Sequence, residues 1–245
     1  MVGCPETIAQ KKSKFSSTAT PLDQVCQHDR NHKTGGQSHR MVTPMRLAIS
    51  NPEKILRLLD GKLTKPMELT IYGRAALALG FAHPKADFLS TKDVDAVIPI
   101  CTLDAFREND EFWNAQEEIN KELEPHGLYM THLFTDADVI IRPDWTEHRV
   151  PISMDFRNLR LYRPATIDLI LTKMMRDDPI DLEDVNFLIL QEPAVALQIP
   201  AVFDQAKVPD TPEIPSQFEK MKPKVVQIAN RFKTQNQPPS FGDPE

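Results

Sequence analysis

The sequence predicts an α+β fold, in which a mixed β-sheet is flanked by helices and followed by a helical C-terminal portion. The prediction depends on two observations. Short segments with strand alternation are interleaved with helical periodicity up to about residue 162, and after residue 166 only helical periodicity remains.

The two ends of the chain differ from its centre in composition. Residues 1–44 are polar and lack a sustained apolar period, so we expect a disordered tail. Met41 and Met45 stand just before the first ordered signal, and our hypothesis is that one of them is the natural start. The remaining expected boundaries are an α/β core at 45–160, a helical portion packed on it at 161–232, and a disordered tail at 233–245.

The first ordered elements have clear start and stop signals. Asn51 suits an N-cap and Pro52 the first helical position, and Gly61 is a plausible stop, which predicts a helix between them. Residues 67–72 alternate apolar and polar side chains and predict a strand. Residues 74–81 are rich in Ala and Leu and predict a short buried helix.

The middle of the chain predicts further strands around one long helix. That helix is expected over 103–124, with Phe112, Ala115, Ile119 and Leu123 as its buried stripe. The strands are expected at 94–100, 128–134, 138–141, 150–156 and 159–162. In the C-terminal portion, helices are expected at 166–176, 182–190 and 216–232, and we expect Pro223 to kink or break the last of them.

Bulk properties limit the classes of function. The net charge of −6 and pI near 5.7 argue against a broad, non-specific nucleic-acid surface, although a local basic groove stays open. No apolar run approaches the roughly 18–20 residues that a membrane helix needs, so no membrane association is expected. The three cysteines are too few and too scattered for a disulfide framework, which favours a cytoplasmic setting.

Two adjoining segments carry the strongest chemical signal. Residues 71–77 combine a strand, Gly73 and a helix start, and a glycine at such a turn lets phosphate approach backbone N–H groups. Residues 91–97 predict a strand on which Asp93 and Asp95 share one face while Val94 points into the core. Two carboxylates on one face can hold a hard divalent cation, so a site for Mg²⁺ and a nucleotide is expected.

The order of these motifs resembles that of the nucleotidyltransferase superfamily. Its pattern is a hydrophobic residue, Gly and a small residue opening a helix, then Asp-hydrophobic-Asp, then a third carboxylate on a neighbouring strand. The matching residues are Tyr72-Gly73-Arg74, Asp93-Val94-Asp95 and Met154-Asp155-Phe156.

The abortive-infection type of bacterial nucleotidyltransferase toxin is the more similar branch of that superfamily. Thr91 precedes the Asp pair, as in that branch. Asp168 and Lys173 match a later helix of that branch. Asp181 and Asp184 match the Asp-x-x-Asp that opens the helix after it. The resemblance covers roughly residues 52–190.

The resemblance implies transfer of a nucleotide from an NTP to an acceptor that is RNA, protein or a small molecule. Asp93, Asp95 and Asp155 would hold Mg²⁺ or Mn²⁺ and serve catalysis together with Lys173. Gly73, Arg74 and Thr91 would contact the nucleotide. It also implies a toxin paired with an antitoxin protein, whereas the oligomeric state is not indicated.

Several alternatives stay open. Arg74 stands where the family prefers Gly or Ser, and Leu89 where it often has Arg, so a catalytically weakened protein that binds a nucleotide or a partner is the alternative function. Asp138 and Asp144 are alternative third carboxylates. Lys173 is equally well explained as a solvated side chain with a packed stem, and the carboxylates Asp181 and Asp184 as helix caps.

Overall fold

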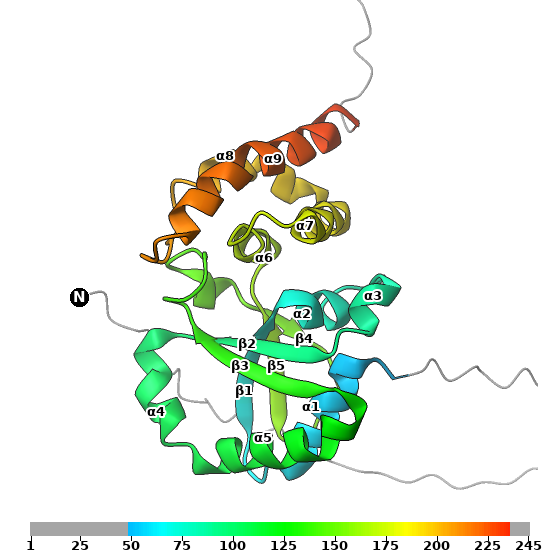
Figure 1. Cartoon of the computed structure of the whole chain (residues 1–245). Coiled ribbons are helices and arrows are strands. Elements are labelled where there is room, and N and C mark those ends of the chain that lie inside the picture. Colours follow the sequence, from blue (N-terminus) through cyan, green and yellow to red (C-terminus); the bar gives the residue numbers. More distant parts are fainter. Residues whose placement is uncertain (1–48, 236–245) are drawn as a thin grey trace, which may run out of the picture. The chain divides into compact units, whose positions relative to one another are not determined.

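The computed structural model describes residues 49–235, apart from the side chains of 132 and 233–235. A five-stranded sheet of order β3-β2-β1-β5-β4 organises this part of the chain (Figure 1). Its strands are β1 (Met67–Tyr72), β2 (Asp93–Ile98), β3 (Tyr129–Thr135), β4 (Val150–Ile152) and β5 (Leu159–Arg163). The β1–β5 and β2–β3 pairs are parallel, and the β1–β2 and β4–β5 pairs are antiparallel. The mixed sheet and the α+β class are therefore confirmed.

Five helices precede or connect the first three strands, and helices among them pack on one face of the sheet. They are α1 (Asn51–Lys62), α2 (Gly73–Leu79), α3 (Ala86–Leu89), α4 (Leu103–Arg107) and α5 (Asp110–Leu123). Helix α1 packs on β2, and α5 packs on β3. On β2, Val94 and Ala96 point to this side and are fully buried in the main core, because side chains alternate along a strand.

The opposite face of the sheet packs against a smaller hydrophobic cluster. Polar residues also lie on this face, near the end of β1. Val97 packs there with Val139, Ile141 and Trp145, and Tyr72 lies at the margin of this cluster. Asp93 and Asp95 are in the same alternation as Val97, so they belong to this face. The main core and the polar residues are thus separated by the sheet itself.

The C-terminal portion is helical, as expected. It consists of α6 (Thr166–Thr172), α7 (Pro179–Gln191), α8 (Ile199–Val202) and α9 (Ile214–Gln235), and α7 packs on both α6 and α9. Figure 1 shows these helices gathered on the side of the sheet where β1 ends and α2 begins. The expected boundary at 160/161 falls inside β5, since the helical portion begins only at Thr166.

Several predicted elements differ from the structure. The long helix at 103–124 is two helices, because Asn109 caps a new start at α5 by accepting from the N–H of Phe112 at 3.1 Å. The strand at 138–141 is a turn with a single bridge from Ile141 to Lys207. Pro223 does not break α9, which runs through it, and the helix at 166–176 ends at Thr172.

The tail prediction at 1–44 lies outside the described residues, as does the part of the 233–245 prediction after residue 235, where α9 ends. Within residues 49–235, no helix combines the length and the apolar character that crossing a membrane requires.

Candidate functional site

A pocket of about 320 Å³ lies where β1 ends, β2 begins and α6 leads into α7. The sheet side of its wall is formed by Tyr72, Gly73, Arg74, Thr91, Asp93 and Asp95. The helical side is formed by Thr172, Lys173, Met175, Arg176 and Asp181. Six of the seven predicted site residues therefore line one pocket, and Asp155 is the exception.

Gly73 turns the chain from β1 into α2. Its φ of 64° lies in the left-handed region, which a residue with a Cβ adopts only at a cost. A Cβ at this position would lie 3.6 Å from Oδ2 of Asp95, so the backbone of the turn passes close to the carboxylate. Because α2 has only seven residues, this close approach matters more than a helix dipole.

Asp93 and Asp95 lie side by side on the polar face of β2, as the alternation predicted. Asp95 is paired with Tyr72 in the β1–β2 ladder, which places it next to the Gly73 turn. Each carboxylate accepts a hydrogen bond from a threonine hydroxyl on its Oδ1. Thr91 donates to Asp93 at 2.9 Å, and Thr131 of β3 donates to Asp95 at 2.8 Å. Both carboxylates are half-buried, and these donors fix their orientation.

Tyr72 forms the apolar wall beside this pair of carboxylates. Its ring meets Phe134 edge to face, with centroids 5.8 Å apart. Burial raises the pKa of Tyr72 well above its ordinary value, and the neighbouring carboxylates, Asp95 first, raise it further. The phenol is therefore neutral and does not supply a base.

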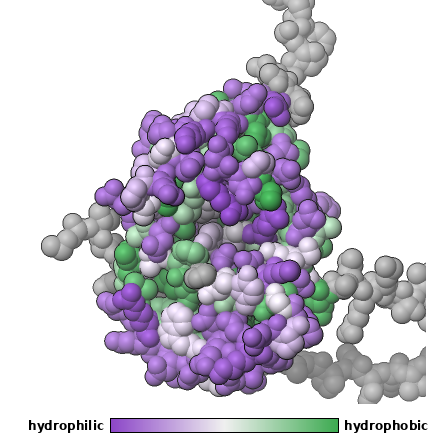
Figure 2. Space-filling model, viewed as in Figure 1, coloured by the Kyte–Doolittle hydropathy of each residue, from purple (hydrophilic) through white to green (hydrophobic). Residues whose placement is uncertain are grey.

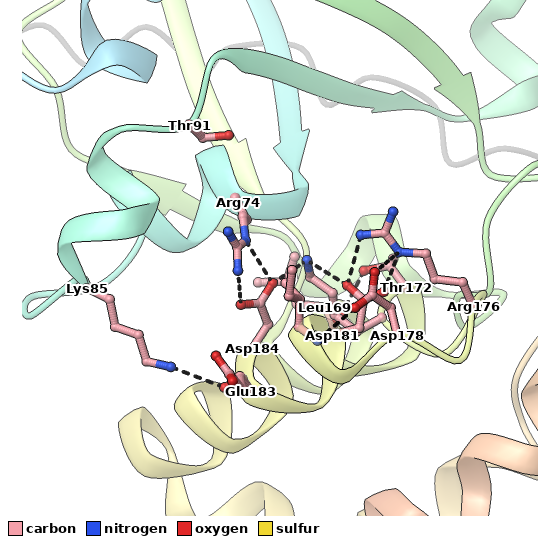
Figure 3. Close-up of polar contacts among 12 residues, drawn as sticks. Arg74, Lys85, Thr91, Leu169, Thr172, Arg176, Asp178, Asp181, Glu183 and Asp184 are labelled. Atoms are coloured by element: carbon pink, nitrogen blue, oxygen red, sulfur yellow. Dashed lines mark hydrogen bonds and ion pairs between the residues drawn. The ribbon is translucent and has the colours of Figure 1, made fainter.

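Two buried carboxylates of α7 organise the helical side of the pocket. Asp181 and Asp184 are 2% and 0% exposed and are three residues apart, so they share a face of the helix. Lys173 Nζ contacts Asp184 at 2.7 Å and Asp181 at 3.4 Å. Arg176 Nε contacts Asp181 at 2.5 Å, while its side chain stays 66% exposed (Figure 3).

Arg74 joins the same network from the sheet side. Its Nη2 and Nε lie 3.3 and 3.4 Å from the carboxylate oxygens of Asp184, and its guanidinium lies 5.5 Å from the ring centroid of Phe88. Figure 3 shows Arg74 directed at α7. Arg74 is thus held at the edge of the pocket by a buried carboxylate.

A separate ion pair anchors α6, which precedes Lys173. Asp168 is fully buried and receives both Nε and Nη2 of Arg142, at 2.9 and 2.7 Å. Such a two-point contact fixes the orientation of both groups. Asp168 therefore holds α6 in place and does not reach the pocket.

Asp155 is not brought to the carboxylate pair. It is exposed in the loop between β4 and β5. Asp60 accepts from the N–H groups of 157, 158 and 159 that end this loop, and Met67, where β1 begins, is paired with Leu159. Since Asp95 is paired with Tyr72, where β1 ends, Asp155 lies at the opposite end of the sheet. The structure therefore does not bring the three predicted carboxylates together.

The alternative third carboxylates have other roles. Asp138 accepts from the N–H and hydroxyl of Thr135, and Asp144 contacts His148 at 3.1 Å. Within residues 49–235, no group of three or more His, Cys, Asp or Glu side chains is arranged to hold a metal ion.

Three contributors to the site had no assigned role in the sequence. Thr131 supports Asp95 from β3, Arg176 pairs with Asp181, and Met175 lines the apolar side. The Asp-x-x-Asp spacing did indicate a helix face with two carboxylates, but nothing local indicated that three cations surround them.

Charge is divided across the pocket. Asp93 and Asp95 of β2 contribute negative charge. Lys173 and Arg176 from the helical side and Arg74 from the sheet side contribute positive charge, and these cations are paired with Asp181 and Asp184. Larger hollows exist elsewhere, including one of about 540 Å³ between α7 and α9, but this pocket contains six of the predicted site residues. Comparisons of the chain with protein-family models, curated proteins and solved structures find no match.

Proposed function

We propose that the pocket binds a nucleoside triphosphate together with Mg²⁺ or Mn²⁺, and that the protein transfers the nucleotide to an acceptor. The observation that supports this is the divided charge of the pocket. Arg74, Lys173 and Arg176 would neutralise phosphate oxygens, with the arginines able to contact them at two points. Asp93 and Asp95 would share a divalent cation with those phosphates.

The donor set fits a cation that arrives with its substrate. Mg²⁺ is commonly bound by one or two carboxylates, with substrate phosphates and water as the remaining ligands. Asp93 and Asp95 satisfy that requirement, whereas the described residues offer no all-protein cage. The cation, when bound, would neutralise charge that develops on the phosphates.

The chain's own residues account for binding and orientation. Thr91 and Thr131 hold the carboxylates in one orientation, and Gly73 lets the backbone pass close to Asp95. In the proposed transfer, an acceptor hydroxyl oxygen bonds to the α-phosphorus and the bond from that phosphorus to the bridging oxygen breaks. Pyrophosphate leaves, and the hydroxyl proton passes to a pocket carboxylate or to water.

One observation favours the alternative, a nucleotide-binding protein with weakened catalysis. With Asp155 at the other end of the sheet, the residue that the resemblance assigns as the third metal ligand does not reach the pocket. A role as the toxin of a toxin–antitoxin pair is part of the same proposal and depends on the family resemblance alone.

Calorimetry with each NTP in the presence of Mg²⁺ tests the proposal. Binding to the wild type that Asp93→Asn and Asp95→Asn abolish is the expected result. Asp155→Asn is the matched control, since it removes the same charge at the far end of the sheet and should leave affinity unchanged. If no NTP binds, both the transferase and the alternative, a nucleotide-binding protein with weakened catalysis, are rejected. Transfer of radiolabel from a bound NTP to RNA or protein then separates enzyme from binder.

A further inference from the structure

Helices α5 and α9 carry opposite charge. Helix α9 contains five lysines or arginines and one glutamate, whereas α5 contains five aspartates or glutamates and one lysine. Figure 1 places the two helices at opposite ends of the described part of the chain. Hydrophilic residues cover much of both ends on the side seen in Figure 2. Charge of one sign gathered on one element produces a local potential that the net charge of −6 conceals.

The basic end has a groove of about 540 Å³ along the contact between α7 and α9. Lys224 and Arg231 line it from α9, and because they are seven residues apart they stand on one face of that helix. Lys85 and Glu183 complete the charged lining, so the excess positive charge comes from α9. Lys224 pairs with Asp177, and its side chain is still 43% exposed. We call Lys224 and Arg231 the basic face.

The acidic end presents a matching pair of side chains. Glu117 of α5 and Glu124, where η2 (Glu124–His126) continues from that helix, are exposed and are also seven residues apart. Together with Tyr129, which is 40% exposed, they line a hollow of about 550 Å³. Glu117 pairs with Lys121 at 2.6 Å, and its side chain stays 65% exposed. We call Glu117 and Glu124 the acidic face.

The two faces match in spacing and in chemistry. A helix rises about 1.5 Å per residue, so a separation of seven residues places the members of each pair about 10 Å apart along the helix axis. Two ion pairs can therefore form together when α5 of one copy lies along α9 of another. Tyr129, beside the acidic face, would then meet the apolar side chains of Leu182 and Ile228 in the groove. Tyrosine is enriched at protein interfaces.

We infer that the acidic face of one copy of the protein docks on the basic face of a second copy. The occupant is a second copy because both the complementary charge and the shared spacing are found within this chain. The two faces are different surfaces, so the copies join head to tail, in a ring or an open chain. Exposed ion pairs contribute little individually and are screened by salt, so the association should be weak and salt-sensitive.

The inference does not depend on the proposed function. None of the four residues of the two faces lines the nucleotide pocket. Variants of either face should therefore keep the NTP affinity of the wild type, and failure of one proposal leaves the other in place.

Sedimentation equilibrium of the full chain tests the contact. In about 20 mM salt, the weight-average mass should rise above the monomer mass of 27.9 kDa as the protein concentration increases, and it should return to that mass in about 0.5 M salt. The double variant Lys224→Glu and Arg231→Glu should weaken association at least about tenfold. Glu117→Lys and Glu124→Lys together should do the same.

The two double variants change the net charge in opposite directions, so a loss in both cannot come from general repulsion between copies. Arg157→Glu and Arg160→Glu together are the matched control. They make the same change in charge as the variant of the basic face, at exposed positions outside α5 and α9, and should associate like the wild type.

A mixture of the two double variants gives the sharpest test. The reversed basic face of one variant is complementary to the reversed acidic face of the other. An equimolar mixture should therefore recover association that neither variant shows alone.

Carbodiimide crosslinking locates the contact, because it joins an amine to a carboxylate only when the two groups touch. The expected product between copies joins Lys224 to Glu117 or Glu124. The product that joins Lys224 to Asp177 within one copy is the internal positive control. A mixture of ¹⁵N-labelled and unlabelled protein distinguishes the two kinds of product by mass.

Three results would overturn the inference. They are a constant mass of 27.9 kDa in low salt, equal weakening by the control variant, and no recovery when two folded double variants are mixed. If thermal melting shows a double variant unfolded, Lys224→Gln and Glu124→Gln are tested singly, and each should weaken association at least about threefold.

Discussion

Arg74 and Asp184 lie 110 residues apart in the sequence and form an ion pair, with 3.3 Å between Nη2 and Oδ1. The pair joins α2, at the end of β1, to α7 of the helical portion. Lys173 shares the same carboxylate at 2.7 Å. A carboxylate with no exposed surface thus holds two cations of the pocket, and their positions depend on it.

Replacing Asp184 should therefore destabilise the protein more than replacing Arg74. Asp184→Asn leaves buried Lys173 with only a 3.4 Å contact to Asp181, and breaking a buried pair costs about 3–5 kcal/mol of unfolding free energy. The side chain of Arg74 is 30% exposed, so Arg74→Gln should cost about 1 kcal/mol or less. Urea unfolding measures both, and equal losses would contradict the assignment of Asp184 as the organising group.

Gly73→Ala should weaken nucleotide binding, while Gly127→Ala should not. Both glycines have φ near 60°, so each substitution should cost about 1–2 kcal/mol of stability from backbone strain. Only the Cβ at position 73 would lie near a pocket group, 3.6 Å from Asp95, whereas position 127 has nothing within 4 Å. Calorimetry with NTP and Mg²⁺ after matched melting curves distinguishes them. Equal NTP affinities would show that the turn does not contact the ligand.

Removing the hydroxyl that supports Asp95 should weaken metal-dependent binding. Thr131→Val deletes a 2.8 Å hydrogen bond, worth about 1 kcal/mol or about fivefold in affinity, and Thr131→Ser should restore most of it. Thr102→Val is the control, because its hydroxyl bonds to the carbonyl of Pro99 outside the pocket. Titration with NTP in the presence of Mg²⁺ measures the affinity of all three variants. If Thr102→Val lowers the affinity as much as Thr131→Val does, the role of Thr131 in supporting Asp95 is contradicted.

The stability that Asp60 contributes should disappear in acid. Partial burial raises the pKa of Asp60, but bonds from three backbone N–H groups outweigh it and hold the pKa below its ordinary value of 3.8. A lowered folded-state pKa contributes stability that is present above 3.8 and disappears as the pH falls through the folded value. The difference in unfolding free energy between wild type and Asp60→Asn should thus be constant from about pH 7 to pH 5 and shrink below about pH 4. A difference that grows in acid would contradict the assignment.

Local patterns were enough to predict the carboxylate pair and the turn beside it. Strand alternation alone places Asp93 and Asp95 on one face, because successive side chains point to opposite sides of any strand. Gly73 could be located because it stands between a segment with strand alternation and a segment with a helix-forming composition. Both features depend on neighbours within a few positions, and the structure has both.

The position of Asp155 could not be obtained in that way. An Asp between two apolar residues after a predicted strand is locally the same whichever end of the sheet it occupies. The antiparallel pairing of β4 with β5 and the parallel pairing of β5 with β1 carry this loop to the start of β1. Strand direction and order are properties of the assembled sheet, so the third carboxylate was misplaced.

The sequence by itself determined the α+β class, the carboxylate pair and the glycine turn, because each is encoded in short-range periodicity and backbone preference. Only the tertiary structure decided which charges meet. Thr131 reaches Asp95 from another strand, and Arg74 reaches Asp184 from another layer. Asp184 is fully buried, and a charge removed from water is costly unless it is paired. Its stability in the core therefore depends on the cations that the fold places beside it, Arg74 and Lys173.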